Sequence, residues 1–197
     1  LDVMEGEAGY GRAMGGDPDW SRAFATLGED FHITRMTFKN HACCGHTFAA
    51  IDGAIALQKK LNIKASEIEG VDVATYRAGL EVAHYENPAT PAEARFSLKY
   101  VVATGLTHGS VRLAAFEQER IEDPATRALM KRIQVSLDPQ LDAAFPAQRA
   151  ARVAIRAGGR SEEHLQPTRI GDPDAPLSDA QLEEKYLELA SPVIGVG

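Results

Sequence analysis

The sequence has no apolar run that approaches the roughly 20 residues a helix needs to cross a bilayer. Its first residues also lack the basic and apolar pattern of a secretory signal. Only two of the 197 residues are cysteine, too few for a disulfide framework, and this favours a reducing compartment. We therefore expect a cytoplasmic protein with no membrane partner.

Positive charge is also scarce. The formal net charge is −7, and no long basic run is present, so nucleic acid and anionic membrane surfaces are poor partners. The chain lacks a Walker sequence and a GxGxxG turn that opens a helix, so no nucleotide cofactor is expected. An anionic substrate would need a local cationic site, because the overall field repels it.

The first 28 residues are rich in glycine, with five glycines and one proline between residues 6 and 19. This composition predicts a loop. The following "SRAFATLG" suits a short helix that ends at Gly28. Since the chain opens on Leu1, we expect this segment to leave some earlier element of a longer or processed protein.

The rest of the chain mixes strands and helices. Alternating apolar residues predict strands over 31–38 and 68–77, and an apolar face at helical spacing predicts a helix over 47–62 with Thr47 as its N-cap. Thr90, Pro91 and Glu93 form a strong helix start. That helix is expected to reach about Thr107, to end at Gly109, and to be buried because it is apolar nearly all round, Phe96 included.

Further elements follow towards the C-terminus. We expect a helix capped by Asp123, strands over 133–137, 149–157 and 161–170, a hairpin at the glycines 158 and 159, and a last helix with Ser178 as N-cap and Gln181 in the capping-box position. The fold class is then α+β, an antiparallel or mixed sheet with helices on one face. We assign residues 29–170 to this domain.

The stretch "KNHACCGHT", residues 39–47, concentrates reactive side chains. His41, Cys43, Cys44 and His46 are zinc-ligand types, but four ligands within six residues are cramped and no CxxC spacing exists, so metal is disfavoured. A disulfide between neighbouring cysteines makes a strained ring and is also disfavoured. The simpler interpretation is two small thiols where the chain enters a helix.

A third interpretation rests on position. The stretch precedes a predicted helix, whose free N–H groups attract anions, and Lys39 adds a full positive charge. His41 and His46 can carry protons near neutral pH. This corner could bind a carboxylate next to acid/base groups. The residue types leave open the plainer alternative, in which Lys39 is solvated and the histidines satisfy turn backbone.

Four segments together resemble one family. "MEGEAGYGRAM", "FKNHACCGHTFAAIDGAIAL", "NPATPAEARFSLKYVVATGLTHGSV" and "GDPDAPLSDAQLEEKYLELA" are similar, in that order, to motifs of the MmgE/PrpD family and cover nearly the whole chain. The resemblance implies a smaller α+β domain beside a large helical domain that is mostly missing here. Residues 1–28 would then be a flanking segment from the preceding helical domain, and residues 171–197 a segment that returns to it. It also implies cofactor-independent proton chemistry on small di- and tricarboxylic acids, in the manner of dehydratases, decarboxylases and epimerases, and a homodimer formed through the helical part.

The resemblance also assigns roles to residues. Lys39 matches the family's cleft lysine, a contact to a substrate carboxylate, and Cys44, Gly45 and Thr47 match the neighbouring substrate-binding segment. Where the family often carries a histidine this chain has a phenylalanine, and His46 is a candidate replacement. The catalytic candidates are therefore Lys39, His46 and His41, with no metal and no cofactor. Two other functions stay open, a non-catalytic anion-binding or assembly domain and a small zinc module.

Overall fold

A computed structural model of the chain describes residues 3–15 and 18–195, and it divides the chain into two compact units, Leu1–Met36 and Thr37–Gly197. The first unit holds α1 (Tyr10–Gly15), α2 (Trp20–Phe24) and a 3-10 turn, His32–Arg35. The short helix predicted before Gly28 is present but ends at Phe24. The predicted division at residues 28 and 170 concerns a longer protein and stays a prediction.

The strand predicted over 31–38 is wrong. Residues His32–Arg35 form the 3-10 turn, in which the Thr34 N–H and hydroxyl both donate to the carbonyl of Phe31, at 3.0 and 2.8 Å. Side chains in this segment, Phe31 and Ile33 included, are exposed. An alternating pattern forms a strand only where a neighbouring strand accepts its backbone hydrogen bonds, and none of the described strands does so here.

The second unit is built on a mixed four-stranded sheet. Its strands are β1 (Gly70–Thr75), β2 (Ile133–Leu137), β3 (Ala151–Ala157) and β4 (Arg160–Gln166), in the order β2-β1-β3-β4. β1 pairs parallel with β2, and the other pairs are antiparallel. The β3–β4 hairpin turns at two glycines with φ of 58° and 71°, the positive values that such a tight turn requires. The α+β class with a mixed sheet is confirmed.

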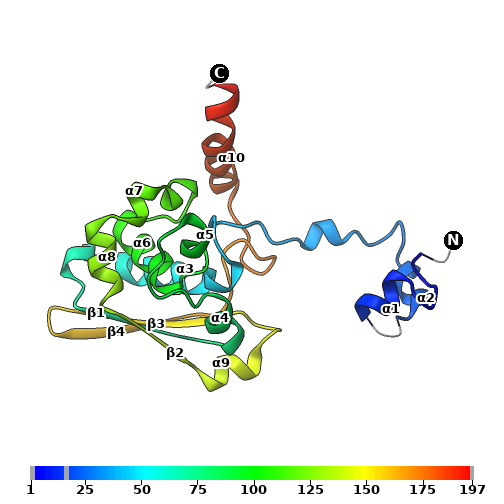
Figure 1. Cartoon of the computed structure of the whole chain (residues 1–197), viewed down its shortest axis with the longest axis horizontal. Coiled ribbons are helices and arrows are strands. Elements are labelled where there is room, and N and C mark those ends of the chain that lie inside the picture. The colour runs from blue at the N-terminus through cyan, green and yellow to red at the C-terminus, as the bar shows by residue number, and fades with distance from the viewer. Residues whose placement is uncertain (1–2, 16–17, 196–197) are drawn as a thin grey trace. The chain divides into compact units, whose positions relative to one another are not determined.

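Helices α3 (Phe48–Leu61), α6 (Leu98–His108) and α8 (Pro124–Met130) lie together on one side of this sheet (Figure 1). Alternate residues of β1 and β3 face these helices, and the side chains of Val71, Val73, Val153 and Ile155 are at most 1% exposed. Helices α3 and α6 approach closely at Gly105, where an added Cβ atom would lie only 3.2 Å from the side chain of Ile51. Burial of each such apolar side chain contributes roughly 1.5–3 kcal/mol.

The helix predicted from Thr90 to about Thr107 is two helices. Thr90 and Glu93 form the expected capping box, but α5 covers only Pro91–Ala94. Ser97 then caps α6, accepting from the N–H of Tyr100 at 3.2 Å. Phe96, expected to be buried, lies at the break and is 41% exposed. The cap of Ser97 offers the backbone an alternative to continuing α5.

Four further helices complete the second unit, three of them short and not predicted: α4 (Arg77–Val82), α7 (Gln118–Ile121), α9 (Pro139–Ala144) and α10 (Asp179–Ile194). The last helix begins with the predicted capping box of Ser178 and Gln181. Its side chains are all at least partly exposed, including Tyr186, Leu187 and Val193. Within the described residues, no helix is both long and apolar enough to cross a membrane.

Candidate functional site

The stretch from Lys39 to Thr47 crosses the surface of the helical layer before α3 begins. It is held by backbone hydrogen bonds to distant segments: the N–H of Ala42 donates to Val111 at 2.9 Å, and the N–H of Cys44 donates to Arg95 at 3.1 Å. A 3-10 turn, Gly45–Thr47, then leads into α3 at Phe48. The predicted helix start is confirmed within one residue. Thr47 has the predicted N-cap position, but its side chain makes no cap hydrogen bond to α3.

His41 forms a buried pair with Asp52 of α3. Both residues are 5% exposed, and His41 Nε2 lies 2.9 Å from Asp52 Oδ1. The second carboxylate oxygen of Asp52 accepts from the N–H of Ile170 at 2.9 Å. In a neutral ring whose Nε2–H donates to Asp52, Nδ1 carries the lone pair. This Nδ1 atom is buried and has no partner among the described residues.

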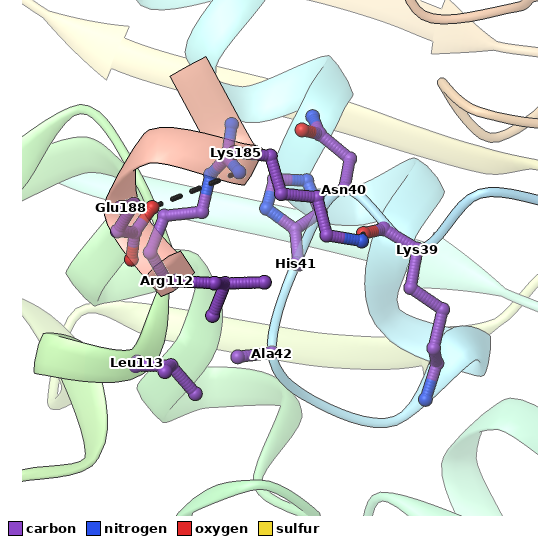
Figure 2. A pocket seen from close by; sticks show the side chains of 9 residues that line it. Lys39, Asn40, His41, Ala42, Arg112, Leu113, Lys185 and Glu188 are labelled. Carbon is purple, nitrogen blue, oxygen red and sulfur yellow. Dashed lines mark hydrogen bonds and ion pairs between the residues drawn. The ribbon is translucent and has the colours of Figure 1, made fainter. Parts of the chain in front are cut away.

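A pocket of about 290 Å³ opens beside this pair (Figure 2). Three cationic residues and one carboxylate contribute to its wall, so local charge favours an anion although the chain as a whole is acidic. A second hollow, of about 400 Å³, shares Asn40, His41 and Arg112 with the first. The first pocket is lined by Lys39, Asn40, His41, Ala42, Arg112, Leu113, Lys185, Glu188 and Leu189.

Lys39 lies at the rim of this pocket. Its carbonyl oxygen accepts from the Lys185 ammonium of α10 at 2.7 Å. Its own Nζ lies 5.9 Å from the centre of the Phe48 ring, and Figure 2 shows the side chain directed away from Arg112 and His41. The side chain is exposed. The other two cationic residues that line the pocket are Arg112 and Lys185.

His46 lies in different surroundings. Its Nδ1 is 2.9 Å from the Tyr76 hydroxyl, and Tyr76 stacks on Phe145 with 4.7 Å between ring centres. Burial, with Arg149 and Arg169 nearby, lowers the pKa of His46 below its ordinary value. Burial raises the pKa of Tyr76 to about 12. The tyrosine therefore stays protonated, and the tautomer of the imidazole decides which of the two groups donates.

His46 does not line the pocket that contains His41 and Lys39. The structure therefore brings Lys39 and His41 together and places His46 beside the tyrosine instead. Of the four residues predicted to bind substrate, Thr47 is fully buried, and its N–H and hydroxyl both donate to the carbonyl of Cys44, at 3.0 and 2.8 Å. Gly45 faces Arg169, whose Nη1 would lie 3.1 Å from an added Cβ.

The backbone N–H groups of Cys44 and Thr47 both have protein acceptors in this structure. The two cysteines are free thiols. Burial raises the pKa of Cys43 to about 12, whereas Cys44 is partly exposed. The described residues include no group of three or more histidines, cysteines or acidic residues placed to hold a metal ion.

Sequence reasoning missed Asp52, Arg112 and the α10 residues of the pocket. Asp52 did leave a signal, since it is a lone acidic residue on an otherwise apolar helix face, between Ile51 and Ala54. A buried carboxylate needs partners, so its position alone indicates a polar contact within the core. Arg112 left none, because its neighbours come from segments far away in the chain.

These features define an α+β domain whose mixed sheet supports a cation-lined pocket beside a buried histidine–carboxylate pair. The chain belongs to the MmgE/PrpD family: the sequence model of the MmgE/PrpD C-terminal domain matches residues 41–196. The match covers most of the second unit, including the stretch with His41 and the closing helix.

Several curated proteins are similar to the chain at low identity. It is 24% identical over 176 residues to the cis-aconitate decarboxylase-like protein oryM of Aspergillus oryzae, covering 85% of this chain and 36% of that protein. It is 28% identical over 192 residues to a 2-methylcitrate dehydratase of Escherichia coli, covering 87% and 40%. A 2-methylcitrate dehydratase of Salmonella typhimurium is 29% identical over 116 residues, covering 56% and 24%. The chain thus spans less than half the length of these relatives.

Proposed function

We propose that the chain is the C-terminal domain of a lyase or isomerase that works without a cofactor on a small di- or tricarboxylic acid. For a dehydratase or an epimerase, the reaction begins with removal of a proton from a carbon next to a carboxylate, and loss of water or return of the proton to the opposite face follows. For a decarboxylase, loss of carbon dioxide leaves a carbanion, and the same acid/base group delivers a proton to it. The names of the relatives, dehydratase and decarboxylase, support this class.

The observation that carries the proposal is the His41–Asp52 pair beside a cation-lined pocket. Asp52 fixes the ring so that Nδ1 is the basic nitrogen. Nδ1 takes the proton from the substrate carbon, and the imidazolium that forms is next to the Asp52 carboxylate, which stabilises it. Because Nδ1 is covered in this structure, a shift of the neighbouring Asn40 side chain or a bridging water completes the path.

Lys39 supplies a second function. Its exposed ammonium at the pocket rim binds a substrate carboxylate and offsets the negative charge that develops when the proton leaves. A charge-assisted contact of this kind contributes about 1.5–3 kcal/mol, or roughly ten- to a hundred-fold in the affected constant. Lys39→Met keeps the apolar stem and removes the charge. Loss only in KM would indicate substrate binding, and loss in kcat as well would indicate charge stabilisation.

The test uses the longer protein that contains the helical part. It is incubated in D2O with 2-methylcitrate, citrate or cis-aconitate, and deuterium uptake, loss of water and loss of carbon dioxide are followed by mass spectrometry. His41→Gln should reduce proton exchange about 10²- to 10⁴-fold, the range typical of a general base. The matched control is His84→Gln, since His84 is an exposed loop residue whose Nδ1 contacts the Glu81 carbonyl.

Full exchange activity in a folded His41→Gln protein would overturn the role of His41. Absence of exchange or turnover with all three acids in the wild-type protein would favour a non-catalytic anion-binding or assembly domain instead. We also expect the 197-residue chain by itself to fold and to be inactive, because the missing part would supply the complementary acid/base groups. Turnover by the isolated chain would contradict that expectation.

A further inference from the structure

Unpartnered polar atoms are concentrated on one wall of the pocket. Among the described residues, five buried side-chain nitrogen or oxygen atoms have no hydrogen-bond partner, and three of them belong to Asn40, His41 and Arg112. These three residues also form the wall that the two hollows share. Folded proteins leave few buried polar groups unpaired, because each costs free energy. A cluster of three therefore indicates atoms that await a ligand.

Arg112 has a carboxylate nearby but no close hydrogen bond to it. The carboxylate of Glu188 on α10 lies 3.7 Å from Arg112 Nη1, too far for a hydrogen bond although within reach of an ion pair. The Arg112 side chain is only 17% exposed, so its guanidinium is partly removed from water. Figure 2 shows Glu188 on one side of the Arg112 guanidinium, joined to it by the ion pair, with His41 and Asn40 on the other side. The guanidinium is thus attracted to a carboxylate that it does not fully bind.

We propose that Asn40, His41 and Arg112 form a subsite for a carboxylate that carries a hydroxyl on the adjacent carbon. The substrate carboxylate binds the Arg112 guanidinium, towards which the Glu188 carboxylate is now directed. This inference rests on the proposed function for the choice of acid, because it assigns one end of that same substrate. Nothing in the family resemblance assigned a role to Asn40 or Arg112.

The three unpartnered atoms suit this chemistry in their hydrogen-bonding roles. Arg112 Nη1 only donates, and a carboxylate only accepts. The unpartnered atom of Asn40 is Oδ1, which only accepts, so it suits the hydroxyl on the adjacent carbon rather than the carboxylate. His41 Nδ1 also carries a lone pair, since Nε2–H is engaged by Asp52, and it stays free to take the proton from the substrate carbon. A simple carboxylate would leave the Asn40 oxygen unpaired, whereas a 2-hydroxy acid offers a group to each of the three residues.

The proposal is tested by binding to the 197-residue chain, with citrate and tricarballylate as probes. Both have three carboxylates, but only citrate has the hydroxyl. Citrate is titrated into 15N-labelled protein at constant ionic strength, and the Arg112 side-chain N–H and the amides of residues 40–42 are followed by NMR. We expect these signals to shift and citrate to bind several-fold more tightly than tricarballylate. Arg112→Met should weaken citrate binding about tenfold or more.

Glu188→Gln should have the opposite effect on citrate affinity to Arg112→Met. If Glu188 competes for the guanidinium, its removal should tighten citrate binding, and Glu183→Gln should not. Glu183 is an exposed residue of the same helix outside both hollows, so that control makes the same change in net charge. Arg160→Met, at the exposed hairpin turn, is the matching control for the loss of a cation.

Equal citrate affinity in wild-type and Arg112→Met protein would overturn the subsite, as would equal affinity for citrate and tricarballylate or no binding at all. Should Arg112→Met fail to fold, Asn40→Asp replaces it, since a carboxylate at that position pairs with Arg112 and should abolish binding. The outcome is separate from the proposed function. Citrate can bind here while the longer protein shows no proton exchange, and exchange can occur while Arg112→Met has no effect.

Discussion

The Nε2 atom of His41 lies 2.9 Å from Oδ1 of Asp52, and this contact joins the stretch before α3 to the middle of that helix. Because the other oxygen of Asp52 accepts from the N–H of Ile170, one carboxylate connects three parts of the chain. The His41–Asp52 pair therefore has a structural role in addition to its proposed role in catalysis. It holds the pocket wall in place while it orients the imidazole.

Removal of this carboxylate should destabilise the fold. Asp52→Ala breaks two buried hydrogen bonds, so we expect the free energy of unfolding to fall by about 2–4 kcal/mol. Urea denaturation measures it, with Asp174→Ala, an exposed residue, as the control that should change little. In a double-mutant cycle with His41→Ala the two losses should not add, because each removes the same contact. Additive losses would show that the two side chains are not coupled.

The two neighbouring thiols should differ in reactivity. Burial raises the pKa of Cys43 to about 12, and only a thiolate reacts fast with alkylating reagents. Cys44 is partly exposed. In native, unreduced protein, iodoacetamide should modify Cys44 first and Cys43 only after unfolding, with peptide mass spectrometry as the readout. Modification of Cys43 at the rate of Cys44 would contradict the buried position, and loss of both thiols without reductant would indicate a disulfide.

Elements with strong local signals were predictable from the sequence. The face of Ala50, Ala54 and Leu57 forms α3 as predicted, and the two glycines at 158 and 159 form the hairpin turn. Such signals lie within a few residues of one another, so the sequence displays them directly. The predictions failed where a segment far away in the chain determines the local structure. Residues 31–38 have the pattern of a strand, but none of the described strands pairs with them.

The site shows the same limit. Lys39 and His41 were predictable because they share one short stretch with a predicted helix start. The separation of His46 from His41 was not, because it depends on Tyr76, which approaches from the end of β1. Arg112 and the α10 side chains that it faces are joined only by tertiary packing. Sequence spacing carries no information about such a contact.

The segment that carries Lys39 depends on a glycine after β4. The N–H of Phe38 donates to the carbonyl of Gly171 at 2.8 Å, and a Cβ at Gly171 would collide with the carbonyl oxygen of Phe38. Gly171 also has φ of 105°, where other residues are strained. Gly171→Ala should therefore reduce the free energy of unfolding by about 1–3 kcal/mol.

The control for that change is Gly159→Asn, at the hairpin turn. Its φ of 71° suits asparagine, and no atom lies within 4 Å of an added Cβ. Thermal or urea unfolding should show a clear loss for Gly171→Ala and a small one for Gly159→Asn. Equal effects would show that the close approach to Phe38 has no energetic weight.

The protonation of His46 should make stability depend on pH. Burial, with Arg149 and Arg169, lowers its pKa in the folded protein below the ordinary value of 6.5. Above that value the ring is neutral in both the folded and the unfolded chain, so His46 does not lower the free energy of unfolding. As the pH falls through about 6.5, the unfolded chain takes up a proton that the folded chain does not, so the free energy of unfolding decreases. The decrease ends below the folded pKa, where both forms are protonated.

His46→Gln removes this contribution, so its free energy of unfolding should fall less than that of wild type between about pH 7.5 and about pH 5.5. His84→Gln, at an exposed loop, is the control. Arg149→Met should raise the pKa of His46, measured from the NMR shift of its ring proton, because one of the repelling cations is gone. A His46 pKa at or above 6.5 in the wild-type protein would contradict the buried contact with Tyr76, and an unchanged value in Arg149→Met would exclude the arginine as a cause.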